Sequence, residues 1–186
     1  MVAEIEEAGG TAFVHPADLS DMDDVERLAD EVLAEHGGVD VLINNAGRSI
    51  RRSLRLSLDR FHDYERTMQL NYFGAVKLIL KLVPAMAERQ RGHIINVSSI
   101  GVQTNTPRFS AYVASKAALD AFSRCIASEV VDDGIHITTV YMPLVRTKMI
   151  APTKMYDYFP AITPEEAAQQ ILLHLQREGY IGARAD

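Results

Sequence analysis

Apolar and polar residues follow one another along this chain in two periods, one typical of helices and one typical of buried strands. Apolar residues recur at helical spacing among glutamates up to Gly9-Gly10, and again over residues 21–35. Between these two segments, the run from 13 to 19 predicts a strand. A helix end followed directly by a strand is the middle of an α/β unit, so the chain begins inside such a repeat.

The same alternation continues to the end of the chain. Strands are expected at residues 39–43, 93–97 and 135–141, and the first of them has almost no polar residue, as expected for a parallel strand covered on both faces. A long helix capped by Ser57 should run to about residue 89, and a second should cover residues 112–131. Thr163 followed by Pro164 and two glutamates predicts the start of a last helix.

Repeated strand–helix alternation predicts an α/β fold with a doubly wound parallel sheet and right-handed crossovers. The length of 186 residues fits one domain with a substantial core. Residues 1–186 show no repeat, low-complexity segment or internal linker. A single Rossmann-like domain is therefore expected.

Composition disfavours several classes of function. Apolar residues make up 47% of the chain, and the net charge is −6, which disfavours a nucleic-acid surface. The single cysteine, Cys125, suits a reducing cytoplasm, and no signal peptide is visible. The most apolar stretch, residues 75–87, is interrupted by Lys77, Lys81 and Pro84, so no membrane span is expected. The six histidines show no ligand spacing, so no metal site is predicted.

Candidate chemistry lies where strands end, because ligands of open parallel sheets bind at the carboxyl ends of strands. The most specific pattern is Tyr112 with Lys116, which share a helix face at i and i+4. A cation one turn away favours the phenolate and lowers the tyrosine pKa, which would make a general acid/base. An ordinary surface contact between the two side chains is the alternative.

Four further motifs stand in order around this pair. They are NNAG at 44–47, the asparagine of LNYFG at 71, NVSS at 96–99 and the segment 143–147, besides YVASK at 112–116. Together the motifs resemble the classical short-chain dehydrogenase/reductase family, over nearly the whole chain. A lone YxxxK is a weak signal, whereas the ordered set is a strong one.

The resemblance implies specific roles. Tyr112 would be the proton donor, Lys116 would lower its pKa and hold the nicotinamide ribose, Ser99 would orient the carbonyl, and Asn71 would hold a water of a proton relay. The cofactor NAD or NADP would be contacted by a set of residues at the strand ends: Asp18, Leu19, Asn45, Ala46, Gly47, Pro143, Val145 and Thr147. The family usually has glycine after the proline, where this chain has Leu144.

Substrate and assembly follow from the same resemblance. The run NNAGRSIRRSL is similar to the reductase domain of actinobacterial fatty acyl-CoA reductases, which favours NADP and a long-chain acyl or aldehyde substrate. Arg48, Arg51, Arg52 and Arg55 would bind an acidic group, or form a solvated basic loop. The resemblance implies a homodimer or homotetramer, for which four apolar helix positions could serve, although some of them must instead face the sheet: Leu78, Leu82, Leu119 and Phe122.

The family begins with a strand, a glycine-rich turn, a helix and a second strand, and none of these is found in this chain. That turn seats the cofactor pyrophosphate at a helix N-terminus. The 186 residues alone are therefore expected to be poorly stable and to bind dinucleotide very weakly. Two alternatives stay open: a non-catalytic, partner-binding remnant, and a sugar-nucleotide epimerase, which also uses YxxxK.

Overall fold

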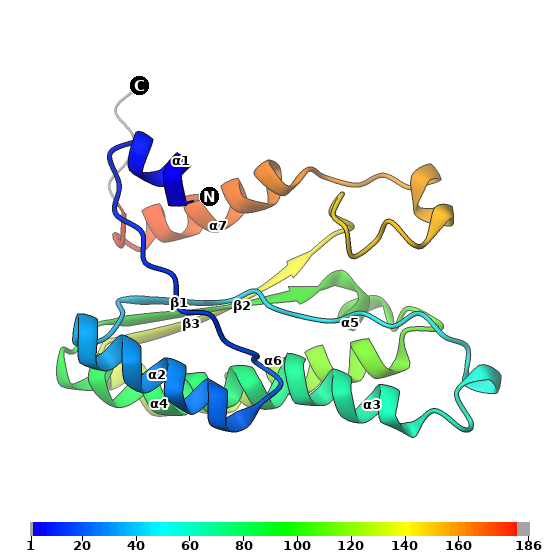
Figure 1. Ribbon diagram of the computed structural model, residues 1–186, viewed down its shortest axis with the longest axis horizontal. Helices are drawn as coiled ribbons and strands as arrows, with labels where there is room; N and C mark the ends of the chain where they lie inside the picture. Colours follow the sequence, from blue (N-terminus) through cyan, green and yellow to red (C-terminus); the bar gives the residue numbers. More distant parts are fainter. Residues whose placement is uncertain (1, 182–186) are drawn as a thin grey trace.

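A computed structural model describes residues 2–181. Its centre is a parallel sheet of three strands in the order β1 (Val41–Asn44), β2 (Gly92–Ser99) and β3 (Ile135–Met142) (Figure 1). Val41 pairs with His93, and Gly92 pairs with Ile135. All three strands lie within one residue or two of the positions that the apolar runs predict.

Helices cover both faces of this sheet (Figure 1). Helices α2, α4 and α6 lie on one face, and α7 lies on the other. The bounds are α1 (Val2–Glu7), α2 (Met22–His36), α3 (Phe61–Met68), α4 (Ala75–Glu88), α5 (Ile100–Thr104), α6 (Ser110–Val130) and α7 (Pro164–Arg177), with a π-helical turn at Gln69–Gly74 and short 3₁₀ turns at Leu54–Leu56, Val131–Asp133 and Lys154–Tyr158. The predicted α/β architecture is confirmed.

The core lies between the sheet and the α4–α6 layer. Ile79 and Met86 of α4, Ile94 of β2 and Ile135 of β3 are each at most 1% exposed. Burial of such side chains contributes about 1.5–3 kcal/mol each. This packing fixes the strand ends and the start of α6, which carry the candidate chemistry.

Side chains cap the starts of α2 and α7, and only the second of these caps was predicted from the sequence. Asp21 caps α2 by accepting a hydrogen bond from the Asp23 backbone N–H at 3.0 Å. Thr163 and Glu166 form a reciprocal capping box at the start of α7, with distances of 2.7 and 3.2 Å.

The strand predicted over residues 13–19 is absent. Residues 11–18 run extended but pair with no strand of the described chain, and Phe13 and Val14 are about two-thirds exposed. The segment is held by α2 instead, because Arg27 donates to the Pro16 carbonyl at 2.7 Å and the Asp18 N–H donates to Asp24 at 2.6 Å. A strand sequence without a neighbouring strand edge has no ladder to join.

The cap predicted at Ser57 is also wrong. The helix begins at Phe61, and the Ser57 hydroxyl donates to the Ser53 carbonyl at 2.9 Å. From Phe61 the helix runs to Glu88, with its middle turn widened to a π-helix at Gln69–Gly74. There Gly74 passes so close to the Leu19 carbonyl that a Cβ would lie 2.2 Å from the oxygen.

By length and composition, the continuous helix Phe61–Glu88 could cross a membrane. The expectation from Lys77, Lys81 and Pro84 was that residues 75–87 could not. Within this fold it serves as a core helix. Ile79 and Met86 pack into the protein, while Lys77 and Lys81 bind Glu26 of α2 at 2.7 and 3.3 Å.

The positions proposed for a subunit interface need correction. Leu78, Leu82 and Leu119 are 7%, 4% and 2% exposed, so they belong to the core of this chain. On the same helix, Leu80 is 62% exposed and is free for contacts that the leucines at 78 and 82 cannot make.

His93 lies fully buried between β3 and α7. Its Nε2 is 3.0 Å from the Thr138 hydroxyl, which is 2.8 Å from Nε2 of His174, and its Nδ1 has no hydrogen-bond partner among residues 2–181. Burial, together with His174 and His136, lowers the His93 pKa from 6.5 to about 4, and Glu178 opposes this weakly.

We expect the free energy of unfolding to fall as pH drops from about 6.5 to 4. In that window the unfolded chain binds a proton at residue 93 that the folded chain excludes, so folding loses up to about 3 kcal/mol. Urea titrations at several pH values measure the slope. His93→Gln should remove this component, whereas His62→Gln, on an exposed side chain, should keep it; an unchanged slope in His93→Gln would contradict the assignment.

Candidate active site

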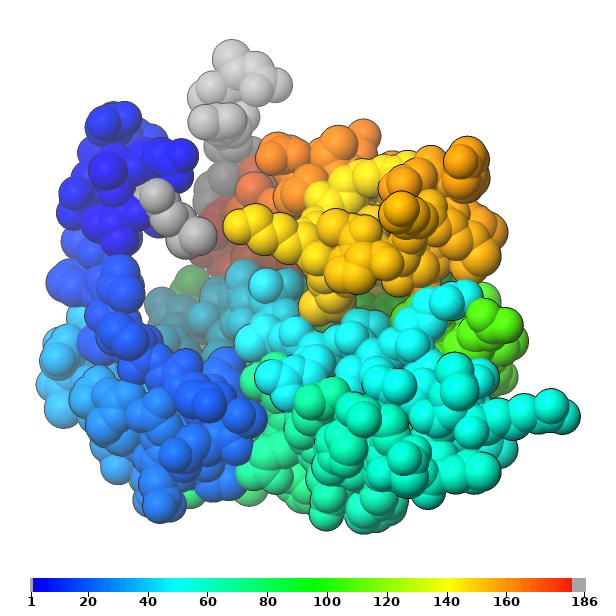
Figure 2. All heavy atoms as spheres, turned by 45° about the vertical axis from the view of Figure 1, so that its right-hand side comes forward, coloured from blue at the N-terminus to red at the C-terminus, as the bar shows by residue number. Residues whose placement is uncertain are grey.

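A cavity of about 1430 Å³ opens at the carboxyl edge of the sheet. Its walls are the ends of β1, β2 and β3 with the residues that follow them, the start of α6, the loop from 143 to 160 and the first turns of α7. Figure 2 shows this loop, in yellow and orange, above the cyan residues that follow β1. Sequence positions more than 100 residues apart thus meet at one site.

Ser99 and Tyr112 lie on the same cavity wall. Ser99 ends β2 and caps α5, where its hydroxyl accepts from the Gly101 N–H at 3.1 Å. Tyr112 lies in the first turn of α6. Burial raises the Tyr112 pKa above its ordinary value, and the Ser99 hydroxyl beside it opposes that rise.

Lys116, one turn after Tyr112, is only 4% exposed. Its Nζ donates to the Val97 carbonyl of β2 at 2.7 Å, and burial lowers its pKa to about 8. The expected lowering of the Tyr112 pKa by Lys116 is not found in this structure. The ammonium is turned toward a backbone carbonyl, and the cost of burying a phenolate dominates.

Asn71 lies 1% exposed inside the π-helical turn, as its poor fit to a regular helix suggests. Its side-chain oxygen accepts from the Arg48 N–H at 2.7 Å, and its amide nitrogen donates to the Arg48 carbonyl and the Ser115 hydroxyl, both at 2.9 Å. Asn71 therefore fixes the backbone that follows the NNAG motif. Its amide already makes three protein hydrogen bonds, so a water would have to bind other atoms of the turn.

The NNAG segment approaches these side chains through its glycine. A Cβ on Gly47 would lie 3.4 Å from the Asn71 side-chain oxygen and 3.5 Å from the Lys116 Nζ. Asn45 and Gly47 line the cavity, whereas Ala46 is exposed outside its lining. The bare glycine keeps open the space between Asn71 and Lys116.

A row of three buried polar side chains, joined by hydrogen bonds, links two strands of the sheet to α6. Sequence reasoning assigned it no role. Asn44 donates to Asn96 at 2.9 Å, and Asn96 donates to Ser123 of α6 at 2.8 Å. All three are at most 7% exposed. The signal for it was the presence of amides inside otherwise apolar strands, because buried polar groups need partners.

The loop after β3 carries Pro143, Val145 and Thr147 into the cavity lining. Val145 forms a parallel bridge with Ile162, and Arg146 donates to the carbonyls of Tyr156 and Phe159, both at 3.0 Å. Leu144 has no positive φ, so the residue that replaces the family's usual glycine causes no backbone strain here.

Asp18 and Leu19 lie outside this cavity lining. The Asp18 carboxylate accepts from the Ser20 N–H at 2.8 Å and the Ser20 hydroxyl at 2.6 Å, which lowers its pKa. Leu19 packs against the cluster of Val25, Ala29 and Leu78. The structure therefore does not bring these two residues to the Tyr112–Lys116 pair.

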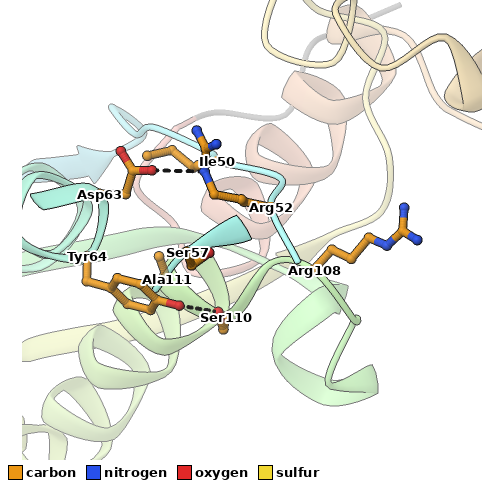
Figure 3. Close-up of a pocket in the computed structure, with 8 residues that line it drawn as sticks. All are labelled: Ile50, Arg52, Ser57, Asp63, Tyr64, Arg108, Ser110 and Ala111. Carbon is orange, nitrogen blue, oxygen red and sulfur yellow. Dashed lines mark hydrogen bonds and ion pairs between the residues drawn. The ribbon is translucent and has the colours of Figure 1, made fainter. Parts of the chain in front are cut away.

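The arginines that follow the NNAG motif lie in two different environments. Arg52 binds Asp63 at 3.1 Å, and Figure 3 shows its side chain pointing toward this carboxylate while Arg108 points away. Asp63 is 2% exposed and also binds Arg60 at 3.3 Å and Arg66 at 2.5 Å. Of the four arginines from 48 to 55, only Arg51 lines the large cavity.

The parallel sheet, with Ser99, Tyr112 and Lys116 grouped in one cavity at its carboxyl edge, defines a Rossmann-like α/β protein. The model of the family described as short chain dehydrogenase matches residues 1–156. The chain belongs to this short-chain dehydrogenase family, whose members are NAD(P)-dependent oxidoreductases.

Individual relatives agree. An uncharacterized oxidoreductase of Mycobacterium tuberculosis is 65% identical over 160 residues, 86% of this chain and 47% of that protein. A fatty acyl-CoA reductase of Acinetobacter baylyi is 62% identical over 170 residues, 91% of this chain and 58% of that protein. The chain thus spans about half the length of these relatives.

Solved structures show the same fold. A short-chain dehydrogenase from Streptomyces avermitilis superposes with a TM-score of 0.80 at 31% identity, covering 94% of this chain and 70% of that one. A metagenomic short-chain oxidoreductase in complex with NADP superposes with a TM-score of 0.77 at 30% identity, covering 92% and 71%.

Proposed function

We propose that this chain provides the catalytic part of an NAD(P)H-dependent carbonyl reductase, with Tyr112 as general acid. The observation that carries the proposal is the convergence of Tyr112, Ser99 and Lys116 on one cavity wall. The bound dinucleotide would supply a hydride to the carbonyl carbon and leave oxidised. The Tyr112 hydroxyl then gives its proton to the carbonyl oxygen, which balances the reduction to an alcohol.

The other residues prepare this proton transfer. The Ser99 hydroxyl, beside Tyr112, would donate to the carbonyl oxygen and orient it. Lys116, which donates to the Val97 carbonyl in this structure, would hold the nicotinamide ribose of the bound cofactor, and its pKa of about 8 allows it to exchange a proton near neutral pH. The raised Tyr112 pKa keeps the phenol protonated until the carbonyl oxygen becomes basic.

The site fits the nicotinamide end of the cofactor better than its pyrophosphate. Gly47 leaves space beside Lys116 Nζ, and Asn45, Pro143, Val145 and Thr147 surround the same cavity. Residues 2–181 contain no glycine-rich turn that leads into a helix, so they offer little to the phosphates. Asp18 would face the adenine, beside Leu19, at the edge of the site.

A long-chain acyl or aldehyde substrate, and thus a role in lipid metabolism, is the finer part of the proposal. The similarity to fatty acyl-CoA reductases and the apolar residues on the outer cavity wall, among them Ile100, Met149 and Ile171, support it. Arg51 would meet an acidic group at the mouth. The metagenomic oxidoreductase that binds NADP favours NADP. We further propose a cytoplasmic homodimer or homotetramer.

A direct assay tests this function. Residues 1–186 are fused behind a glycine-rich strand–turn–helix–strand unit of a short-chain dehydrogenase, and oxidation of NADPH and NADH is followed with short and long aldehydes and acyl-CoA esters. We expect turnover that is faster with NADPH and with long chains. Cofactor binding without turnover of any carbonyl would overturn the proposal.

A second candidate is a non-catalytic chain that binds a partner. It rests on the lack of a pyrophosphate-binding turn among the described residues. Calorimetric titration of the 186 residues alone with NADPH separates the two. We expect very weak binding of this chain, and recovery of micromolar binding in the fusion; a fusion that still binds no dinucleotide would favour the partner-binding role.

A further inference from the structure

Three possible metal ligands meet where the extended segment before α2 crosses the end of that helix. Nε2 of His15 lies 3.4 Å from Nε2 of His36. The Glu35 carboxylate oxygen Oε2 is 3.7 Å from His15 Nε2 and 3.9 Å from His36 Nε2. All three ligand atoms lie within 4.8 Å of one another.

This triangle has nearly the size of one face of a metal-centred tetrahedron. Zinc binds imidazole nitrogen at about 2.0–2.1 Å and carboxylate oxygen at about 2.0–2.2 Å, so tetrahedral ligand atoms lie roughly 3.4 Å apart. The two longer edges exceed that value by only a few tenths of an ångström, which side-chain rotation can remove. Two histidines and a carboxylate with an open fourth position form a donor set that zinc accepts.

The surroundings orient the first histidine. Nδ1 of His15 faces the Glu31 carboxylate at 3.7 Å, and Arg27 fixes Glu31 from the other side at 2.7 Å. A carboxylate behind the non-ligating nitrogen selects the tautomer whose Nε2 is free to bind metal. His15 is the more buried of the two imidazoles, with its side chain 15% exposed against 29% for His36.

The second histidine is also held. The ring of Phe13 lies 4.6 Å from the ring of His36, centroid to centroid, and the two histidine rings meet nearly edge to face. Without a metal, the two Nε2 atoms face each other, so one of them must carry a proton and donate to the other. A cation between them would give both lone pairs a partner.

We propose that His15, Glu35 and His36 bind one divalent transition-metal ion, with zinc as the best fit and water as the fourth ligand. The ligands come from the segment 11–18 and from the C-terminal turn of α2, 20 and 21 residues apart, which is why no local spacing in the sequence revealed them. The ion would tie to α2 a segment that pairs with no described strand. Its role is therefore to hold the fold together at this edge.

The test is a titration of the metal-free 186-residue chain with ZnCl₂ and with CoCl₂ at pH 7.5, by calorimetry and by visible absorption. We expect one ion per chain, tetrahedral cobalt absorption, and a higher melting temperature when zinc is added, because a ligand that binds only the folded chain stabilises it. Binding should be weaker at pH 5.5, because protons compete with the metal for its ligands.

Variants locate the ion. His15→Ala and His36→Gln should each weaken zinc binding at least tenfold, and Glu31→Gln should weaken it by about tenfold through the His15 tautomer. His62→Ala, on another exposed histidine outside the cluster, should bind as the parent does. Circular dichroism shows that each variant remains folded.

Two results would overturn the proposal. One is the absence of saturable binding at a stoichiometry of one by either zinc or cobalt. The other is binding that survives in both His15→Ala and His36→Gln. Should His15→Ala fail to fold, broadening of the His15 and His36 ring signals by cobalt in the parent chain, measured by NMR, decides between a bound and an absent ion.

Discussion

Tyr112→Phe should reduce kcat/KM for carbonyl reduction by about 10²–10⁴-fold, the usual contribution of a positioned general acid. The substitution removes one oxygen atom and leaves the ring, which contacts Phe109 at 6.5 Å between centroids, in its place. Without the hydroxyl, the alkoxide that hydride transfer creates has no proton donor. Steady-state kinetics of the fusion protein, with NADPH and an aldehyde, measure the effect.

The matched control is Tyr158→Phe. Tyr158 is 90% exposed and lies outside the cavity lining, so this variant should keep the parent's activity. Fluorescence titration should show nearly unchanged NADPH affinity for Tyr112→Phe. Turnover within a few-fold of the parent would end the assignment of Tyr112 as the acid.

Lys116→Met should raise the free energy of unfolding and lower the activity. At pH 7 the buried Lys116 ammonium costs the fold about 3 kcal/mol, since its pKa falls from 10.5 to about 8. Methionine removes that cost but leaves the Val97 carbonyl without its donor, at about 1–2 kcal/mol. We expect a net increase of about 1–2 kcal/mol in the free energy of unfolding, together with a loss of carbonyl reduction of at least about 10²-fold.

The pH dependence gives an independent check of this variant. Between pH 8 and 10.5 the unfolded parent holds a proton on Lys116 that the folded parent has released, so the parent's stability rises with pH in that window. Lys116→Met should lose that rise. Lys154→Met, on a 3₁₀ turn of the outer loop, is the control and should keep it. A variant less stable than the parent at pH 7 would show that the lysine side chain is a net stabilising group.

The sequence predicted those parts of the fold that depend on interactions between neighbouring residues. Helix α7 begins at Thr163 because its cap, proline and glutamates act within four residues of one another. The strands β2 and β3 follow from their own short runs of residues, and β2, at the centre of the sheet, is almost fully buried while β3 is buried only in part. The shared site of Ser99, Tyr112 and Lys116 was predicted from the family resemblance of the motifs that carry them, together with the rule that ligands of open parallel sheets bind at strand ends.

Features that depend on contacts between residues far apart in the sequence could not be predicted. Residues 13–19 have a strand's composition, yet a strand forms only against a hydrogen-bonding edge. Lys116 was expected to act on Tyr112, but the nearest strong acceptor is the Val97 carbonyl, whose position only the packed sheet defines. Ser57 had the chemistry of a cap, but the chain makes a separate 3₁₀ turn before the helix begins.

The widened turn at Gln69–Gly74 has a mechanical consequence. A π-turn accommodates an extra residue, and each residue of a regular helix advances the side-chain direction by about 100°. The turn therefore sets the angular phase between α3, whose Asp63 and Thr67 face inward, and α4, whose Ile79 and Met86 enter the core. Deleting one residue elsewhere in Phe61–Glu88 would turn one of these two faces outward by about 100°, whereas deleting one residue within the turn would close it into a regular helix and keep both faces in phase, so this turn is where the helix best tolerates a change of length.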